Sequence, residues 1–526
     1  MEKHIIAVDH GTSGVKCALM TCQGKLIGHA SVKTPLILLP GGGAEQDPTV
    51  WWNSFLAAAK DLLDQRLVPA ESIAGICVSG QWSTTVAVDK DGNHLMNALS
   101  WLDTRGAPYI KDVVRGIINV EGYGLGKIIK FARIVAGGPG LAGKDPVSHM
   151  LFIKHEHPDL YEKTDKFFEC VDFMNFKLTG QAKATFNSAQ LSWCMDNRRL
   201  KSIRYYPPLI KTFGIDRDKL PPLIASTDIA GEVLPGVARE IGLPPGVKVF
   251  GGAGDLAVAA IGSGATRDYE AHVYLGTSSF LICHLPFKKL NLSSKIASIP
   301  SANPAKYFMT IEQENAGNVL TFLRDNMLRP NLDKPPVLEY RDLDVLAAKA
   351  PPGSGKLVFT PWLWGERAPV EDPHIRGGLF NLSLQHTSSH VVRAALEGVA
   401  YNTRWALGHA ERFTKGHKLD PINIIGGGAT SDIWCQIYAD VLGCTMRRVK
   451  DPQWSNARGA AFIAAVGLGQ ITFEQIPDLI EIERIFTPNR DNRPIYDELF
   501  AEFVQIYRNT KKICKRLNQR QTTGGE

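Results

Sequence analysis

The sequence predicts an α/β protein of two similar lobes around a central cleft, and three observations support this fold class. The chain has 526 residues, more than one domain of roughly 100 to 250 residues normally holds. Short apolar runs that are typical of strands alternate with amphipathic segments that are typical of helices. A strand, turn and strand unit containing Gly-Thr-Ser occurs at Gly11 and again at Gly276. We therefore expect one lobe over residues 1–262 and a second over 263–526, with a helical segment from about residue 490.

The first lobe opens with the first copy of the repeated unit. Residues 4–8 and 15–20 are apolar runs, and the turn between them is rich in Gly, Ser and Thr. Eight glycines over residues 116–147 interrupt any helical or strand period, so we expect an irregular loop there. The other elements predicted in this lobe are a helix over 48–64, a strand over 73–79, a hairpin over 86–92, a strand over 247–250 and a helix over 256–261.

The second lobe repeats this pattern. Residues 271–275 and 280–284 predict two strands around the turn that begins at Gly276. Further on, an apolar run over 422–425 leads into three glycines and a helix over 431–441. Each lobe therefore supplies a glycine-rich turn at the end of a strand, where a ligand can approach the backbone closely.

Composition excludes several classes of protein. Hydrophobic residues make up 44% of the chain and charged residues 21%, which is typical of a folded globular protein. The net charge of +6 is dispersed, and a small basic cluster at residues 511–516 is expected to be a solvated helix face rather than a nucleic-acid or membrane contact. No apolar run reaches the roughly 18 residues of a membrane span, and the first residues lack a signal-peptide pattern. The nine scattered cysteines predict neither disulfides nor a structural metal, so we expect a cytoplasmic protein.

The two Gly-Thr-Ser turns favour phosphate binding. Small residues in a tight turn present backbone N–H groups and hydroxyls to an anion without steric hindrance. Asp9 precedes the first turn and supplies a hard oxygen ligand of the kind that Mg2+ prefers. On these residues alone, two purely structural hairpins explain the pattern equally well.

Asp255 is the candidate catalytic base. It follows a predicted strand and a run of glycines, from which a carboxylate projects into a cleft between lobes. Phosphoryl transfer to a hydroxyl requires a group that accepts the hydroxyl proton. The alternative role for Asp255 is that of an N-cap for the following helix, where aspartate is favoured, and both roles are compatible.

The glycines at 426–428 form a third strand-to-helix junction. Such a junction lets a flat adenine or a ribose approach closely, although a structural role for these glycines remains open. The sequence contains neither a GxxxxGK[ST] loop nor a GxGxxG after its first strand, which argues against P-loop and Rossmann nucleotide sites.

Taken together, the motifs resemble those of the FGGY family of carbohydrate kinases, which includes glycerol kinase and xylulokinase. The resemblance extends from His4 to about Gly469, and each motif alone is loose while their order is specific. The motifs are the segments at residues 9–16, 45–48 with Trp51-Trp52, 80–81, 101–105, 251–255, 275–278, 361–369, 390–397 and 426–429.

This resemblance implies an actin-like, ribonuclease H-like fold with ATP and a sugar in the cleft. It implies that Asp9 organises Mg2+ and that Asp255 is the base. The residues that would bind the nucleotide are Gly11, Thr12, Ser13, Lys16, Gly276, Thr277, Gly317, Gly427, Gly428, Ala429 and Asp432. The residues that would bind the sugar are Gln81, Trp82, Asp103 and Asp255.

Two departures from the family pattern concern the acceptor. Leu256 stands where the family usually has a polar residue, and Trp82-Ser83 replaces the pairs found after the glutamine in glycerol kinases and xylulokinases. Trp82 is expected either to stack on a sugar face or to pack in the core. Glycerol is therefore disfavoured.

The expected activity is ATP-dependent phosphorylation of a terminal sugar hydroxyl, with a pentulose such as xylulose as the first choice. The alternatives are a kinase for another ketose or polyol, such as ribulose or an erythritol-type polyol, and a nucleotide-binding sugar sensor without turnover. A chaperone-like ATPase would need a peptide-binding appendage, and no segment after residue 490 is long enough for one. We expect a small-molecule sugar as partner, and a homodimer is one option for the oligomeric state.

Overall fold

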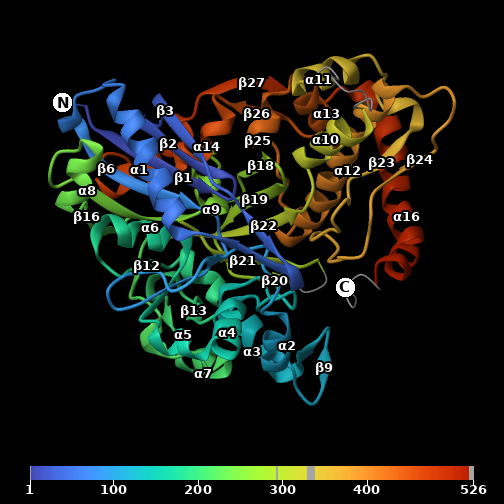
Figure 1. The fold of residues 1–526 in the computed structure, drawn as a ribbon. Helices are drawn as coiled ribbons and strands as arrows, with labels where there is room; N and C mark the ends of the chain where they lie inside the picture. Colours follow the sequence, from blue (N-terminus) through green and yellow to red (C-terminus); the bar gives the residue numbers. More distant parts are fainter. Residues whose placement is uncertain (1, 292–293, 329–337, 520–526) are drawn as a thin grey trace, which may run out of the picture.

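The computed structural model describes residues 2–291, 294–328 and 338–519, and it contains two large β-sheets flanked by helices (Figure 1). The first sheet has six strands in the order β16-β17-β6-β1-β2-β3. Their bounds are β1 His4–Gly11, β2 Gly14–Thr21, β3 Leu26–Lys33, β6 Ile73–Gly80, β16 Ile229–Glu232 and β17 Lys248–Gly254.

The second sheet has eight strands in the order β20-β21-β22-β19-β18-β25-β26-β27. Residues from both ends of the second half of the chain meet in it. Its strands are β18 Ala271–Leu275, β19 Ser279–Leu285, β20 Leu290–Asn291, β21 Ile296–Pro300, β22 Tyr307–Gln313, β25 Ile422–Ile425, β26 Met446–Val449 and β27 Ile482–Phe486.

Six strands of each sheet follow one plan. In the first sheet, β1, β2 and β3 are antiparallel neighbours, β1 is parallel to β6, and β6 is parallel to β17. In the second, β18, β19 and β22 are antiparallel neighbours, β18 is parallel to β25, and β25 is parallel to β26. Each sheet ends in an antiparallel strand, β16 or β27. The predicted two-lobed α/β architecture with an internal repeat is therefore confirmed.

Helices cover both faces of the first sheet. Helix α1 (Pro48–Asp64) begins where predicted, because Asp47 Oδ1 accepts a hydrogen bond from the Thr49 N–H at 2.7 Å and Pro48 occupies the first turn. Its buried residues, which include Trp51 and Phe55, pack on β2 and β3. The other helices of the first half are α2 Ala107–Val114, α3 Leu125–Val135, α4 Pro146–Glu156, α5 Pro158–Lys163, α6 Cys170–Thr179, α7 Pro207–Phe213, α8 Pro235–Ile241 and α9 Asp255–Gly262.

In the second half, the long helix α12 carries much of the core of its lobe, with α13 and α16 packed against it (Figure 1). The basic residues at 511–516 lie on an exposed part of α16, as expected for a solvated face. The helices are α10 Gly317–Phe322, α11 Tyr340–Ala348, α12 Ser388–Phe413, α13 Asp432–Leu442, α14 Ser455–Gly467, α15 Ile476–Leu479 and α16 Arg493–Asn518.

Helices α9 and α14 cross between the sheets and join the lobes into one core. Although α14 follows β26, it packs on β1, β2, β6 and β17 of the first sheet. A Cβ atom on Gly262 would lie 1.8 Å from the Ser455 carbonyl oxygen, and one on Gly459 would lie 2.0 Å from the Val258 carbonyl oxygen. The two backbones therefore touch, and the first turns of α14 lie against α9 between Val258 and Gly262. The division of the chain at residue 262 stays a prediction.

The segment between β6 and β16 forms a further block of helices and short strands with its own core (Figure 1). The loop expected over 116–147 is wrong in part, because this segment contains α3 and the hairpin of β9 (Asn119–Val120) and β10 (Tyr123–Gly124). Phe131, Ile134 and Val135 are buried at helical spacing, so packing outweighs the glycines around them. The other short strands of the first half are β4 Ile37–Leu39, β5 Gly43–Gln46, β7 Val86–Val88, β8 Ala98–Leu99, β11 Lys166–Phe168, β12 Ala184–Thr185, β13 Met195–Asp196, β14 Arg204–Tyr205 and β15 Leu223–Ile224.

The hairpin predicted over 86–92 is only partly present. Val88 and His94 form an isolated bridge across the turn, while the main partner of β7 is the distant strand β11. In the second half, β23 Val358–Thr360 pairs with β24 Gly378–Phe380. Within the described ranges, no helix is both long and apolar enough to cross a membrane.

Candidate active site

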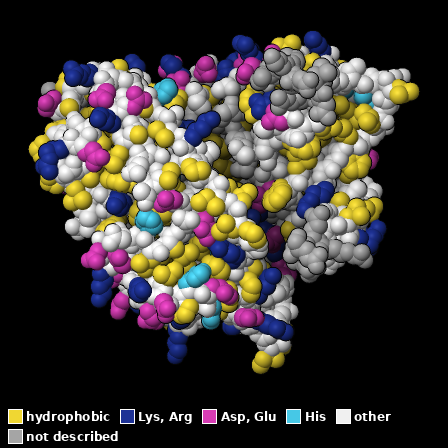
Figure 2. Space-filling model, in the orientation of Figure 1, with side chains coloured by type: hydrophobic (Ala, Val, Ile, Leu, Met, Phe, Trp, Pro, Cys, Tyr) yellow, Lys and Arg dark blue, Asp and Glu magenta, His cyan; other side chains and the backbone are white. Residues whose placement is uncertain are grey.

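The surface is hollowed between the two lobes (Figure 2). Asp9 and Asp255 lie at the ends of two strands of the first sheet, β1 and β17. Strand β6 lies between β1 and β17, and Ser79 of β6 pairs with Asp9 on one side and with Ala253 on the other. Asp255 follows two residues after Ala253, as the first residue of α9. The parallel strands thus end at one edge of the sheet, where both carboxylates emerge.

Asp9 is a half-buried carboxylate at the end of β1. Its Oδ1 accepts a hydrogen bond from Asn456 Nδ2 at 3.4 Å, and Asn456 belongs to the first turn of α14. Burial raises the pKa of Asp9, and the positive charge of Lys16, its cross-strand partner, opposes this shift. No cation within the described residues forms an ion pair with Asp9, so the carboxylate is available to a ligand.

Asp255 has the environment of a group that gains and loses a proton near neutral pH. Burial, then the negative charge of Asp9, raise the pKa of Asp255 to about 7. Its Oδ1 accepts a hydrogen bond from the Leu256 N–H at 2.9 Å. The N-cap of α9 is Gly254, so the alternative role of Asp255 as a helix N-cap is wrong.

A hydrogen-bond network lines the first-lobe wall beside these carboxylates. Thr12 Oγ1 donates to Gln81 Oε1 at 3.1 Å and accepts from Trp101 Nε1 at 2.9 Å. Gln81 Nε2 in turn donates to Gln46 Oε1 at 2.7 Å. These contacts fix the tip of the first Gly-Thr-Ser turn, in which Ser13 is exposed.

Trp82 is a buried residue beside the end of β17. Its exposed fraction is 7%, its indole Nε1 donates to the Ser188 carbonyl at 3.1 Å, and its ring lies against Gly254, next to Asp255. This environment agrees with the core-packing alternative. A sugar contact of Trp82 stays a prediction.

Asp103 is fully buried and is engaged within the protein. It forms an ion pair of 2.6 Å with Arg105 and accepts a hydrogen bond from the Ala44 N–H at 2.9 Å. Arg105 also pairs with Glu45 at 2.6 Å. A contact between Asp103 and a sugar stays a prediction. The two ion pairs of Arg105 join the motif segment at 101–105 to the one at 45–48.

The second Gly-Thr-Ser turn meets the start of α10. The Gly317 N–H donates to the Gly276 carbonyl at 2.8 Å, and the Ala316 N–H donates to the Thr277 carbonyl at 3.1 Å. A Cβ atom on Gly317 would lie 2.6 Å from the Gly276 carbonyl oxygen. Three of the predicted nucleotide residues, Gly276, Thr277 and Gly317, are thus brought together by backbone contacts that need glycine.

The third glycine junction lies against the same strand end. A Cβ atom on Gly428 would be 2.9 Å from Leu275 Cβ, so the turn at Gly427, Gly428 and Ala429 adjoins the Gly276 turn. Asp432, the first residue of α13, forms an ion pair with Arg448 at 2.5 Å and another with Arg484. Two arginines thus neutralise the charge of Asp432. Its contact with adenosine stays a prediction.

The cleft also contains charged residues to which the sequence assigned no role. Arg367 forms ion pairs with Glu312 and Glu314, and its guanidinium lies 6.0 Å from the centre of a Trp101 ring. The Lys144 ammonium lies 5.9 Å from a Trp101 ring and makes no hydrogen bond or ion pair with any described residue. Arg367 stands within the motif at 361–369. Lys144 lies in the glycine-rich segment over 116–147, where no residue pattern indicated a binding site.

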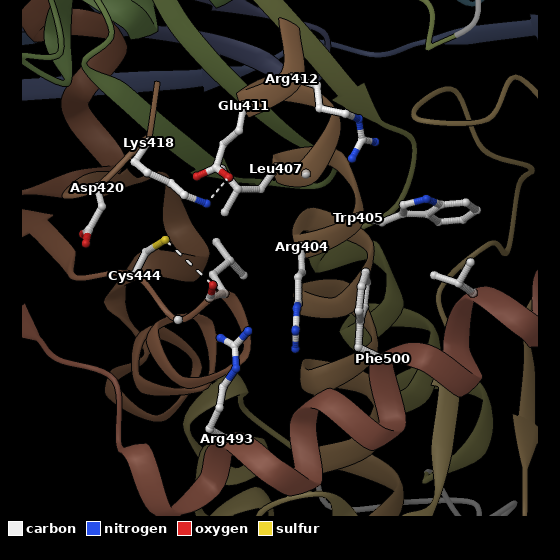
Figure 3. A pocket seen from close by; sticks show the side chains of 14 residues that line it. Arg404, Trp405, Leu407, Glu411, Arg412, Lys418, Asp420, Cys444, Arg493 and Phe500 are labelled. Carbon is white, nitrogen blue, oxygen red and sulfur yellow. Dashed lines mark hydrogen bonds and ion pairs between the residues drawn. The ribbon is translucent and has the colours of Figure 1, made fainter. Parts of the chain in front are cut away.

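A cavity of about 530 Å3 lies elsewhere, between α12, α13 and α16 (Figure 3). None of the predicted site residues lines it. Three of its basic side chains form ion pairs within the protein, Arg404 and Arg493 with Asp497, and Lys418 with Glu411. This cavity is therefore separate from the carboxylate site.

Comparison with known proteins agrees with this geometry. The model of the N-terminal domain of the FGGY family of carbohydrate kinases matches residues 4–262, and that of the C-terminal domain matches residues 271–468. The chain is 28% identical to a xylulose kinase of Staphylococcus epidermidis, with 98% of each chain covered.

Solved structures give the same result. The chain superimposes on a xylulose kinase from Rhodospirillum rubrum with a TM-score of 0.82 and 26% identity, covering 97% of this chain and 100% of the other. A gluconate kinase from Lactobacillus acidophilus gives a TM-score of 0.84 at 24% identity, covering 97% and 99%. The fold is the actin-like fold of these sugar kinases. With both family models spanning most of its length, the chain belongs to the FGGY family of carbohydrate kinases.

Proposed function

We propose that this sugar kinase transfers the γ-phosphoryl group of ATP to a terminal hydroxyl of a ketose, with xylulose as the first candidate. The observation that carries the proposal is Asp255, a carboxylate with a pKa near neutrality that is raised in part by the charge of Asp9. A base of this pKa combines a large deprotonated fraction at physiological pH with useful proton affinity. The full-length similarity to a xylulose kinase supports the choice of sugar.

In this mechanism Asp255 accepts the proton of the acceptor hydroxyl. The acceptor oxygen forms a bond to the γ-phosphorus, the bond from that phosphorus to the bridging oxygen breaks, and ADP leaves. The chain contributes mainly position and charge, as expected for phosphoryl transfer. Water is excluded when the lobes close around both substrates.

Asp9 fits the role of a Mg2+ ligand. It is a half-buried carboxylate with no ion-pair partner among the described residues, and Mg2+ takes one or two protein carboxylates besides phosphate and water. The ion would neutralise charge on the phosphates. The nucleotide would contact Gly11, Thr12, Ser13 and Lys16 from the first lobe and Gly276, Thr277, Gly317, Gly427, Gly428, Ala429 and Asp432 from the second.

The acceptor would lie against the wall formed by Gln81 and Trp101. Lys144 adds a donor there, because its ammonium lies 5.9 Å from a Trp101 ring and has no hydrogen-bond or ion-pair partner among the described residues. Trp82 and Asp103 support this wall from behind through their buried contacts. The acceptor site thus offers an aromatic face and several hydrogen-bonding groups, which is the chemistry that recognises a polyhydroxylated sugar.

The test is ADP release by the purified protein with Mg2+ and ATP, across xylulose, ribulose, other ketoses, polyols and gluconate. We expect turnover with a ketose, and highest with xylulose. Absence of turnover with every acceptor, while ATP still binds, would contradict the proposal and favour a nucleotide-binding sensor. Asp255→Asn is the matched control for sugar-dependent turnover.

A further inference from the structure

The second copy of the repeated unit carries a tyrosine where the first carries Asp9. Asp9 precedes Gly11 by two positions, and Tyr274 precedes Gly276 by two positions. Asp9 belongs to β1, which is antiparallel to β2 and parallel to β6, and Tyr274 belongs to β18, which is antiparallel to β19 and parallel to β25. The internal repeat therefore places Asp9 and Tyr274 at matching positions on the two lobes.

The side chain of Tyr274 is held on two sides. Its ring stacks on Phe280 with centroids 4.5 Å apart and an interplanar angle of 2°. A Cβ atom on Gly276 would lie 2.8 Å from Tyr274 Oη, so the hydroxyl end of the ring lies against the phosphate-facing turn. Tyr274 and Leu256, the neighbour of Asp255, pack on the same central core. This packing fixes the phenol in one orientation beside the site.

The Tyr274 hydroxyl has no hydrogen-bond partner among the described residues. Burial and then the charges of Asp9 and Asp255 raise the pKa of Tyr274, so the phenol stays protonated at physiological pH. The charges of both carboxylates act on this phenol, and its hydroxyl can donate a hydrogen bond to a ligand. Phenylalanine would stack on Phe280 equally well, and packing alone therefore does not account for the hydroxyl.

We propose that Tyr274 is a catalytic residue whose hydroxyl donates a hydrogen bond to a non-bridging oxygen of the phosphoryl group as it passes from ATP to the acceptor. This inference rests on the proposed kinase function. Charge on the transferred group is spread over its three equatorial oxygens, and a fixed donor in a site shielded from water stabilises that charge most in the transition state. Asp9 and Tyr274 would then contact the transferred group from the two lobes.

The test compares wild type with Tyr274→Phe, which removes the hydroxyl and keeps the stacked ring. We expect kcat to fall about a hundredfold, as when one donor to a transition-state oxygen is removed. The KM values for ATP and xylulose and the melting temperature should hardly change. Tyr401→Phe is the control, since Tyr401 is also buried with an unpartnered hydroxyl but lies in α12, outside the site.

A second readout does not depend on turnover. Aluminium fluoride with ADP and xylulose mimics the transferred phosphoryl group, and Tyr274→Phe should weaken its binding by a factor similar to the loss in kcat while ADP alone binds normally. Unchanged kcat, or a change confined to KM, would overturn the inference. If the wild type itself turns over no sugar, the proposed function fails instead, and aluminium fluoride binding still decides whether the hydroxyl contributes.

Discussion

Asp9 and Asp255 flank one residue of the central strand, because Ser79 pairs with Asp9 in β1 and with Ala253, two residues before Asp255, in β17. Neighbouring strands lie about 4.8 Å apart, so this register keeps the two carboxylates close enough for their charges to interact. The resulting rise in the pKa of Asp255 is a consequence of sheet topology and burial together. It connects the fold directly to the proposed chemistry.

The first prediction concerns pH. Because Asp255 must be deprotonated to accept a proton and its pKa is about 7, kcat/KM for xylulose should rise with pH up to about 7 and then level off. Steady-state rates between pH 5 and 9 measure this profile. A rate that is flat down to pH 5 would contradict the assignment of Asp255 as the base.

The second prediction concerns stability. The pKa of Asp255 is raised in the folded protein, so the folded state binds its proton more tightly than the unfolded state does. Stability from this group is present below the unfolded pKa of about 4 and is lost as pH rises toward 7. Asp255→Asn should therefore raise the melting temperature relative to wild type at pH 8 but not at pH 4. An equal effect at both pH values would argue against the shifted pKa.

The third prediction concerns the crossing of α9 and α14. Gly459→Ala would put a methyl group 2.0 Å from the Val258 carbonyl oxygen, which forces the helices apart and should destabilise the protein by about 3 kcal/mol. Gly408→Ala in α12 is the matched control, because that position has room for a Cβ atom and should gain about 0.5–1 kcal/mol. Urea denaturation measures both. Equal stability of the two variants would show that the close crossing is not maintained.

The fourth prediction concerns the acceptor. Lys144→Met removes a donor that is unpaired within the part of the chain that the structure describes, so the KM for xylulose should rise about tenfold or more while the KM for ATP stays unchanged. Lys60→Met, an exposed lysine of α1, is the control and should leave both values unchanged. An unaltered KM for xylulose in Lys144→Met would place the sugar away from this wall.

Local patterns predicted much of the fold. The strand over 422–425 has the bounds of β25, and the helix expected from Pro48 to residue 64 is α1, because a short apolar run and an Asp-Pro start act within a few residues. The two Gly-Thr-Ser turns, each between two apolar runs, predicted the two similar lobes. What failed depends on distant partners: β7 pairs mainly with β11, and α3 forms because its apolar face finds a core.

The candidate site was predictable only where chemistry and motif coincide. Asp9, Asp255 and the three glycine-rich turns were found from their residues. Asn456, which contacts Asp9, comes from a helix 447 positions along the chain, and no local pattern indicates that contact. No local pattern marks Lys144 or Tyr274 as a site residue, and only the tertiary arrangement brings Lys144 to Trp101 and Tyr274 within reach of the charges of Asp9 and Asp255.

The central claim is that Asp255 takes the proton from the sugar hydroxyl, and a single-turnover measurement of Asp255→Asn with saturating ATP, Mg2+ and xylulose tests it most directly. The account predicts that phosphoryl transfer slows by at least about a hundredfold, while ATP binds with unchanged affinity. Transfer at a rate close to that of the wild type would contradict it.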